Sequence, residues 1–284
     1  MNDENQILQS EEDKSNQNIE IALILEAIYL KYGYDFRNYS KAHIKRRILS
    51  RFMREKLSNL SEMQYLLLTN PEWFHNLLLD FSLNVTEMFR DPKFFQAVRA
   101  QVVPLLKTYP FLKIWHAGCS TGEEVYSMAI LLKEEDMLDK CIIYGTDFNQ
   151  IVLDKAAEAI YPLDRMKEYT NNYNKAEGKA SFSDYFSANY NAVLLDKELK
   201  KNIVFSDHNL VTDGVFGEMN MIVCRNVLIY FNRALQEKVI KLFYESLLPG
   251  GILCLGTKET LILSDYNEKF EQISKLNIFK KLYD

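Results

Sequence analysis

The chain has 284 residues, of which 48% are hydrophobic and 13% aromatic, so it can bury one large core or two smaller ones. Its 39 acidic residues outnumber the 34 lysines and arginines, and the net charge of -5 argues against a general nucleic-acid-binding protein. With only 10 glycines and 6 prolines, it is neither a collagenous nor a low-complexity chain.

The character of the chain changes near residue 19. Residues 1–18 are mostly Asn, Gln, Ser, Asp and Glu, with too little apolar content to offset the entropy cost of ordering, so we predict a disordered tail there. From 19 to 82, apolar residues recur at helical spacing, for example Ile21, Leu25 and Ile28. This pattern predicts a small all-helical N-terminal domain.

Residues 83–284 alternate between short β-prone runs and longer helical ones. After a predicted helix around 91–106, the β-prone runs are KIWHA, CIIYGTD, NIVFSD, MNMIVCRN and GGILCLG, and ISKLNIFKKLY ends the chain. Predicted helices at 123–133, 150–159 and 233–248 separate several of these runs. Strands joined by helices of this length indicate a parallel, doubly wound α/β sheet. A polar and aromatic segment at about 170–201 predicts a small antiparallel β insertion.

Several features of the sequence bear on the compartment. The longest apolar runs are too short and too interrupted to span a bilayer, and the chain does not begin with a basic and then apolar leader. Its four cysteines are widely spaced and form no CxxC pair. We therefore expect a cytoplasmic protein with reduced thiols, without membrane insertion and without a metal site.

The sharpest local motif is IWHAGCSTGEE, residues 114–124, where a predicted strand runs into a glycine-bearing turn and a helix. Gly118 and Gly122 allow close approach of a nucleotide-like ligand. The motif is neither G-x-G-x-x-G nor a Walker A loop, and Glu123 and Glu124 would repel a phosphate. S-adenosylmethionine (SAM), which carries a sulfonium, an ammonium and no phosphate, fits better. The alternative is a pair of surface glutamates that cap the helix together with Ser120.

Three further segments place polar residues beside the expected crevice. Asp147 ends the run CIIYGTD, where an acid can accept hydrogen bonds from ribose hydroxyls, although it could equally cap the next helix. Arg225 and Asn226 end an apolar strand, with loop contacts as the alternative. The segment NVTEMFRDPKFF, residues 84–95, either points into the same cleft or is an ordinary helix start at Asp91-Pro92.

A strongly basic stretch lies in the helical domain. Residues 36–56 hold eight lysines and arginines against one acid, Glu55. At 100° per residue, an apolar stripe that includes Ile44 and Ile48 is predicted to face away from three arginines, Arg47, Arg51 and Arg54. This charge run is either a solvated helix face or a surface that steers an acidic protein partner.

The chain resembles the CheR family of chemotaxis protein methyltransferases, which use SAM to methylate glutamates of chemoreceptors. The resemblance covers roughly residues 20–284 and rests on segments that occur in the family's order: NVTEMFRDPKFF, IWHAGCSTGEEVYSMA, YGTDFN, HNL and CRNVLIYF. It implies a helical N-terminal domain, a class I Rossmann-like SAM-methyltransferase domain and a small inserted β-subdomain. One departure is GTKETL at 256–261, where many members carry a GHSE-like sequence.

The resemblance also implies the site residues. The cofactor-binding positions are matched by Asn84, Thr86, Arg90, Glu124, Asp147, Asn209, Leu210, Asn226 and Val227. Arg90 and Tyr230 match positions near the transferred methyl group and are the catalytic candidates. The basic helix resembles the family's receptor-docking helix, so the expected partner is the cytoplasmic helical domain of a chemoreceptor, bound by a monomer.

The implied reaction is methyl transfer from SAM to a glutamate carboxylate, which gives a methyl ester and S-adenosylhomocysteine (SAH). A carboxylate is already ionised at pH 7, so neither a strong base nor a metal is required. Two rival hypotheses remain: a SAM-dependent methyltransferase of another substrate, and a non-catalytic module that binds SAM or SAH for signalling.

Overall fold

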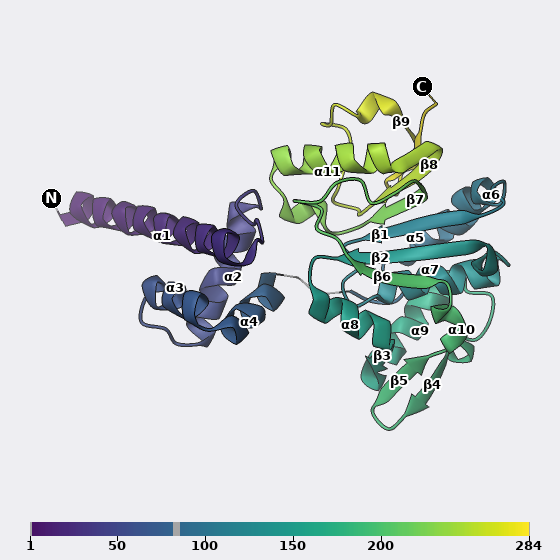
Figure 1. Ribbon diagram of the computed structural model, residues 1–284, viewed down its shortest axis with the longest axis horizontal. Helices are drawn as coiled ribbons and strands as arrows, with labels where there is room; N and C mark the ends of the chain where they lie inside the picture. Colours follow the sequence, from purple (N-terminus) through teal and green to yellow (C-terminus); the bar gives the residue numbers. More distant parts are fainter. Residues whose placement is uncertain (1, 82–85, 284) are drawn as a thin grey trace. The chain divides into compact units, whose positions relative to one another are not determined.

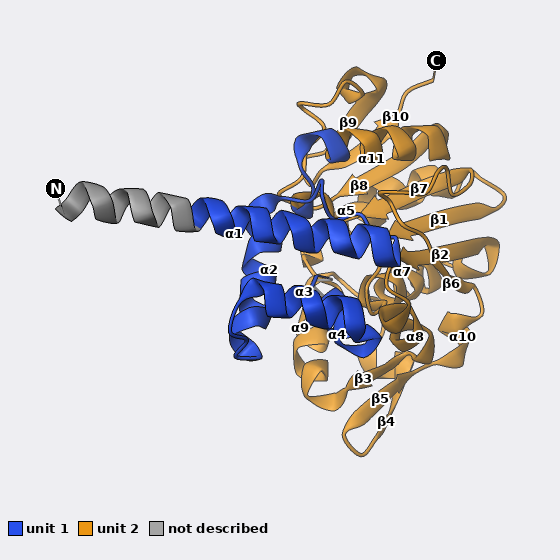
Figure 2. Ribbon diagram, turned by 60° about the vertical axis from the view of Figure 1, so that its left-hand side comes forward, with its two compact units in different colours: residues 1–83, 230–235 blue, residues 84–229, 236–284 orange. Residues whose placement is uncertain are grey.

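The computed structural model describes residues 2–81 and 86–283, and side chains from residue 14 onward. The chain divides into two units, which Figure 2 colours separately. The helical unit comprises residues 1–83 and 230–235, and the sheet unit comprises residues 84–229 and 236–284. The sequence does not predict that the short segment 230–235 belongs to the helical unit.

The helical unit consists of α1 (Asn2–Tyr32), α2 (Lys41–Arg54), α3 (Leu60–Thr69) and α4 (Pro71–Phe81), which confirms the all-helical prediction. Its core includes Ile24, Ile28 and Phe74, all almost fully buried. The expectation of a disordered tail over 1–18 was wrong, because α1 begins at Asn2. The Glu, Gln, Asp and Lys residues there extend a helix that the apolar residues after position 18 anchor.

Helix α2 differs from its predicted orientation at one residue. Its buried residues are Ile44, Ile48 and Arg51, so Arg51 lies on the buried face and not on the basic one. The spacing of four and then three residues explains this placement. Arg51 Nε lies 2.6 Å from Asp80, and Arg51 Nη1 lies 2.6 Å from Glu55. Arg51 therefore holds α2 to α4 inside the unit.

The sheet unit begins with one interrupted helix: α5 (Pro92–Ala97), a π-helical turn (Val98–Val102) and α6 (Val103–Leu106). The N–H of Val103 bonds to the carbonyl of Val98, five residues back. Pro104 next to it has no N–H to continue the regular ladder, which suits a π turn at this point. The prediction of a helix over 91–106 is confirmed.

Seven strands form a mixed sheet in the order β6-β2-β1-β7-β8-β10-β9. Figure 1 shows β6, β2, β1 and β7 of this sheet next to one another. The bounds of the seven strands are β1 (Leu112–Ala117), β2 (Cys141–Asp147), β6 (Ile203–Asp207), β7 (Met219–Cys224), β8 (Leu247–Leu255), β9 (Phe270–Ser274) and β10 (Ile278–Lys281). The first five in chain order run parallel, as predicted. The last two pair antiparallel, because the final predicted run turns back at Asn277, whose φ is +56°.

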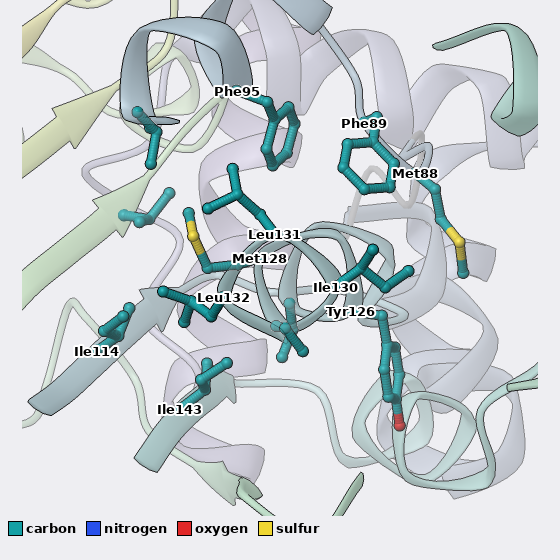
Figure 3. Close-up of a cluster of buried hydrophobic side chains, with 14 of the residues drawn as sticks. Met88, Phe89, Phe95, Ile114, Tyr126, Met128, Ile130, Leu131, Leu132 and Ile143 are labelled. Atoms are coloured by element: carbon teal, nitrogen blue, oxygen red, sulfur yellow. The ribbon is translucent and has the colours of Figure 1, made fainter. Parts of the chain in front are cut away.

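Helices cover both faces of this sheet. They are α7 (Glu123–Glu134), α8 (Gln150–Glu158) and α11 (Arg233–Ser246). Ile114 of β1 points to the face of α7, and Figure 3 shows that helix between strand residues Ile114 and Ile143 on one side and Phe89 and Phe95 on the other. Trp115 points to the opposite face, where its ring centroid lies 5.6 Å from that of Phe243 in α11. The sheet is therefore buried on both faces, as its apolar runs predict.

A second, three-stranded antiparallel sheet is inserted between β2 and β6, and Figure 1 shows it with its neighbouring helices. It contains β3 (Ile160–Pro162), β4 (Phe186–Asn189) and β5 (Ala192–Leu195), with α9 (Met166–Lys175) and α10 (Lys197–Lys200). The insertion begins about ten residues before the predicted position, because β3 already pairs with β5. Short 3-10 turns complete the fold at Leu138–Lys140, Leu163–Arg165, Phe182–Tyr185, Leu228–Tyr230 and Asn267–Lys269.

In the part of the chain that the structure describes, no helix is long and apolar enough to cross a membrane.

Candidate functional site

The candidate site lies at the carboxyl ends of β1, β2 and β7 in the sheet unit. β1 pairs with β2 on one side and with β7 on the other. The strands that follow β1 in the chain are therefore added first on one side of it and later on the other. Open α/β sheets bind their ligands at such a switch point. Three of the predicted segments, the glycine turn, Asp147 and Arg225-Asn226, leave their strands at this edge.

The glycine turn after β1 is held tightly against β2. The N–H groups of Gly118 and Cys119 both donate to the carbonyl of Thr146, each at 2.8 Å. Gly118 has a φ of +77°, and a Cβ built on it would lie 2.6 Å from the side chain of Val227. Only glycine suits this position, because the turn packs directly against the segment after β7.

Asp147 is buried at the end of β2. Its carboxylate accepts the N–H of Ser120 at 3.0 Å and the N–H of Asn149 at 3.1 Å. Burial raises the pKa of Asp147 to about 6. A carboxylate offers about four acceptor positions, so acceptor capacity remains on Asp147 for a hydroxyl donor. Asp147 does not cap α8, because that role belongs to Asn149, whose side chain accepts the N–H of Ile151.

Glu124, in the first turn of α7, belongs to a buried charge network. Its carboxylate lies 2.6 Å from Arg225 Nη1 and 3.3 Å from His116 Nδ1. Arg225 also reaches Asp91 at 2.5 Å and stacks over the ring of Phe94, with 4.1 Å to its centroid. Burial opposes the charge on Glu124, but Arg225 and His116 outweigh it and the pKa of Glu124 is lowered.

The first acid of the turn, Glu123, has a different environment. It is buried and accepts a hydrogen bond from the hydroxyl of Thr121 at 2.7 Å. Burial raises the pKa of Glu123 to about 7. The alternative of two surface glutamates capping the helix with Ser120 was wrong, because the cap residue is Gly122 and no side chain bonds there.

The residue that sequence reasoning missed is Glu259, just after β8. Its buried carboxylate accepts the backbone N–H groups of Gly256, Asn226, Val227 and Ile229, at 2.5, 3.1, 2.8 and 3.4 Å. Burial raises the pKa of Glu259, and these N–H donors oppose the rise. Glu259 thus fixes the backbone after β7. An acid one turn beyond an apolar strand, at the carboxyl edge, is the signal that could have found it.

Asn209 and Leu210 follow β6 at the same edge. The side chain of Asn209 accepts the N–H of Val211 at 3.0 Å, and its backbone N–H bonds to Asp213 at 2.8 Å. Leu210 is buried, and the N–H of His208 bonds to the carbonyl of Asp147 at 3.2 Å. This loop is therefore joined to the strand end that carries Asp147.

The segment before α5 is only partly described. Asn84 lies outside the described residues, and Thr86 is half-buried. The N–H of Phe89 donates to the hydroxyl of Ser127 on α7 at 2.8 Å. Arg90 is half-buried, and its carbonyl lies 3.4 Å from Arg225 Nη1. The structure thus brings Arg90 to the charge network of Glu124.

Tyr230 belongs to the helical unit. Its carbonyl accepts the N–H of Ser40 at 2.7 Å, and its ring lies 5.3 Å from the ring of His43 on α2. Tyr230 is therefore held by the start of the basic helix, while the other predicted catalytic and cofactor-binding residues belong to the sheet unit.

The predicted positions bear on whether SAM suits the site. Asp147 has spare acceptor positions for ribose hydroxyls, and Glu124 supplies a carboxylate near the turn. The close glycine turn offers no lysine or arginine of the kind that binds a pyrophosphate. Among the described residues, no group of three or more His, Cys, Asp and Glu side chains could hold a metal ion. The residues present suit SAM.

The strand order, the inserted sheet and the acidic glycine turn define a Rossmann-like methyltransferase. The family model for the CheR methyltransferase SAM-binding domain matches residues 84–278, and the model for the CheR all-alpha domain matches residues 19–82. The chain belongs to the CheR methyltransferase family.

The chain is similar to several individual proteins. The Cher3 protein of Pseudomonas putida, whose name assigns it a methyltransferase activity only provisionally, is 51% identical over 94% of this chain and 98% of its own length. A chemotaxis protein methyltransferase of Listeria innocua is 30% identical over 81% of this chain and 86% of its own. A solved SAM-dependent methyltransferase of Geobacter sulfurreducens, in complex with SAH, is 15% identical over 55% of this chain and 46% of that one, with a TM-score of 0.31.

Proposed function

We propose that this protein transfers the methyl group of SAM to glutamate side-chain carboxylates of chemoreceptors, as a cytoplasmic enzyme of chemotaxis. The observation that carries the proposal is the pair of acids at the sheet edge, Asp147 and Glu124, in a chain of the CheR family. Relatives named chemotaxis protein methyltransferase, such as the Listeria innocua protein, support the substrate class.

The proposed cofactor contacts follow from the chemistry of each position. Asp147 accepts the ribose hydroxyls, and Glu124 faces the positively charged methionine part. Asn209 and Leu210 lie beside the adenosine, while Asn226 and Val227 line the turn that Glu259 fixes. Asn84, Thr86 and Arg90 close over the cofactor from the segment before α5.

The reaction needs little chemical assistance. When bound, SAM supplies an activated methyl group: an oxygen of the glutamate bonds to its carbon, the carbon–sulfur bond breaks, and the electron pair remains on sulfur in SAH. The attacking carboxylate is already ionised at pH 7, so no base has to remove a proton. Arg90 and Tyr230 orient the carboxylate, and the enclosing side chains exclude water.

The proposed partner surface is the basic face of α2. Arg54 has a side chain that is 55% exposed, although it also bonds to Asp80, and Arg47 is half-buried on the same helix. Arg51 is excluded from this surface, because its side chain is only 10% exposed and is paired inside the unit. A receptor domain rich in glutamates would be steered to such a face by its charge.

The test is transfer of a radiolabelled methyl group from SAM to purified cytoplasmic receptor fragments. We expect labelled fragment in proportion to enzyme, and loss of the label when the receptor's candidate glutamates are replaced by alanine. A methyltransferase of another substrate would bind SAM without labelling the fragment. A non-catalytic signalling module would bind SAH and label nothing, and either result contradicts the proposal.

A further inference from the structure

A cavity of about 510 Å³ opens beside Arg225 in the sheet unit. Its walls come from the start of α5, the end of α9, the end of β8 and the turn before β10. Neither Asp147, Asn209, Val227 nor Glu124 lines it. The cavity is within the usual size range of small-molecule sites, and it is distinct from the proposed cofactor positions.

The interior of the cavity is mainly apolar. Phe94, Leu255 and Leu276 line it, and Leu276 is the most exposed of the three, since Phe94 and Leu255 are almost fully buried. The wall formed by α5 and α9 is fixed, because the side chain of Gln96 donates to the carbonyl of Lys175 at 2.7 Å. These residues form a surface suited to an aromatic ring or a short hydrocarbon chain.

The charges around the cavity are not balanced. Lys93 and Lys175 line it and are exposed, and within the described part of the chain neither ammonium has an ion-pair partner. The third cation, Arg225, is already neutralised by Asp91 and Glu124. Glu177 lies near the rim, 3.3 Å from Gln96, but does not line the cavity. Two cations are therefore available to an anion.

We propose that this cavity binds a small amphipathic organic anion, with its apolar part against Phe94, Leu255 and Leu276 and its carboxylate between Lys93 and Lys175. This is a second ligand site, and it lies beyond the function proposed above. Arg225 lies in its wall and in the network of Glu124, so the two sites share one side chain.

The test is calorimetric titration of the full chain, without cofactor, using 2-naphthoate and its neutral analogue 2-naphthamide. We expect one naphthoate site, with binding at least about tenfold tighter than that of the amide, because only the acid interacts with both ammonium groups. The double variant Lys93→Met with Lys175→Met should lose about tenfold in naphthoate affinity. Equal binding of acid and amide, or no binding of naphthoate at millimolar concentration, would overturn the proposal.

Two further variants control this experiment. Lys241→Met removes an exposed lysine on α11 that lines no part of the cavity, and it should bind naphthoate as the unaltered chain does. Leu276→Trp should fill the cavity and abolish binding, while thermal unfolding verifies that each variant is folded. Naphthoate affinity unchanged in the Leu276→Trp variant would place the ligand elsewhere and overturn the proposal. SAH titrated into the same samples distinguishes the cavity proposal from the cofactor assignment. If the samples bind naphthoate but not SAH, only the cofactor assignment is contradicted.

Discussion

The carboxylate of Glu124 lies 2.6 Å from the guanidinium of Arg225, and the two side chains are 18% and 1% exposed. Arg225 also contacts Asp91 and the ring of Phe94, so a single buried cation joins the ends of β7, the start of α7 and the segment before α5. Such a pair is costly to break, because removing one partner leaves the other charge buried.

Replacing Arg225 by Met should destabilise the protein by roughly 3–5 kcal/mol, because Glu124 and Asp91 lose their common partner. Urea unfolding monitored by circular dichroism measures the change. The double variant Arg225→Met with Glu124→Gln should recover part of the loss, since it leaves one fewer unpaired charge. A loss below about 1 kcal/mol in the single variant would mean that solvent compensates both acids.

Asp147→Asn should weaken SAH binding roughly tenfold to a hundredfold, because an amide is a poorer acceptor for the ribose hydroxyls than a carboxylate. Calorimetry with SAH measures the affinity. The matched control is Asp154→Asn, an exposed acid on α8 whose carboxylate accepts a hydrogen bond from the side chain of Gln150. Equal affinities of the two variants would contradict the assignment of Asp147.

Cofactor affinity should also depend on pH. Asp147 has a pKa of about 6 in the protein, above its ordinary value of 3.8, because it is buried. Hydroxyl donors favour the ionised form, so SAH affinity should rise as the pH increases through 6 and fall about fivefold from pH 6 to pH 5. Glu123 titrates nearby with a pKa of about 7, and the profile of Asp147→Asn distinguishes the two groups. A profile unchanged by this substitution would assign the titration to Glu123.

The same pKa has a consequence for stability in the absence of cofactor. Since the folded protein holds the proton of Asp147 more tightly than the unfolded chain, this residue's contribution to stability should fall as the pH rises from about 4 to 6 and then stay constant. Comparing the unfolding free energy of Asp147→Asn with that of the unaltered chain across this range isolates the effect. A contribution that increased with pH would contradict it.

Glu259→Gln should destabilise the protein by about 2–4 kcal/mol and weaken SAH binding, because an amide nitrogen would face backbone N–H groups that now donate to a carboxylate. Glu271→Gln, an exposed acid on β9, is the control for the change of charge. Urea unfolding and SAH titration are the measurements. If Glu259→Gln were as stable as its control, the four N–H contacts would have little energetic weight.

Charge changes on α2 should act on the partner and not on the cofactor. Arg47→Glu combined with Arg54→Gln should raise KM for a receptor fragment about fivefold to tenfold, more at low salt, and leave SAH affinity unchanged. Lys197→Glu combined with Lys200→Gln, both on α10, is the control for net charge. In contrast, Arg51→Met should reduce stability, because Asp80 and Glu55 lose a buried partner. Unchanged KM in the double variant would remove α2 as the docking surface.

Much of the fold follows from local patterns. Apolar runs such as CIIYGTD predict β2 because both faces of that strand are buried, and helical spacing predicts α7 between β1 and β2. The antiparallel pairing of β9 and β10 was not predicted, since a short run that reverses at a single residue in left-handed conformation, Asn277, reads like one strand. The tail was misjudged because polar composition does not prevent the extension of an anchored helix.

The site residues likewise divide into those that local sequence signals predict and those that they do not. Asp147 could be predicted, because an acid after an apolar strand at a switch point is a local signal. Arg51 and Glu259 could not be placed, because their partners Asp80 and Asn226 are 29 and 33 residues away in sequence. Tertiary contacts decide whether a charged side chain is exposed at the surface or paired inside the protein. The periodicity of a single helix does not predict those contacts.

The most direct measurement is the alkali lability of a methyl group transferred from radiolabelled SAM to a receptor fragment. A glutamate methyl ester releases methanol under mild alkali, so we expect volatile label in proportion to the label on the fragment. Label that stays on the protein after this treatment would mean transfer to nitrogen or another stable acceptor, and it would contradict the carboxylate mechanism.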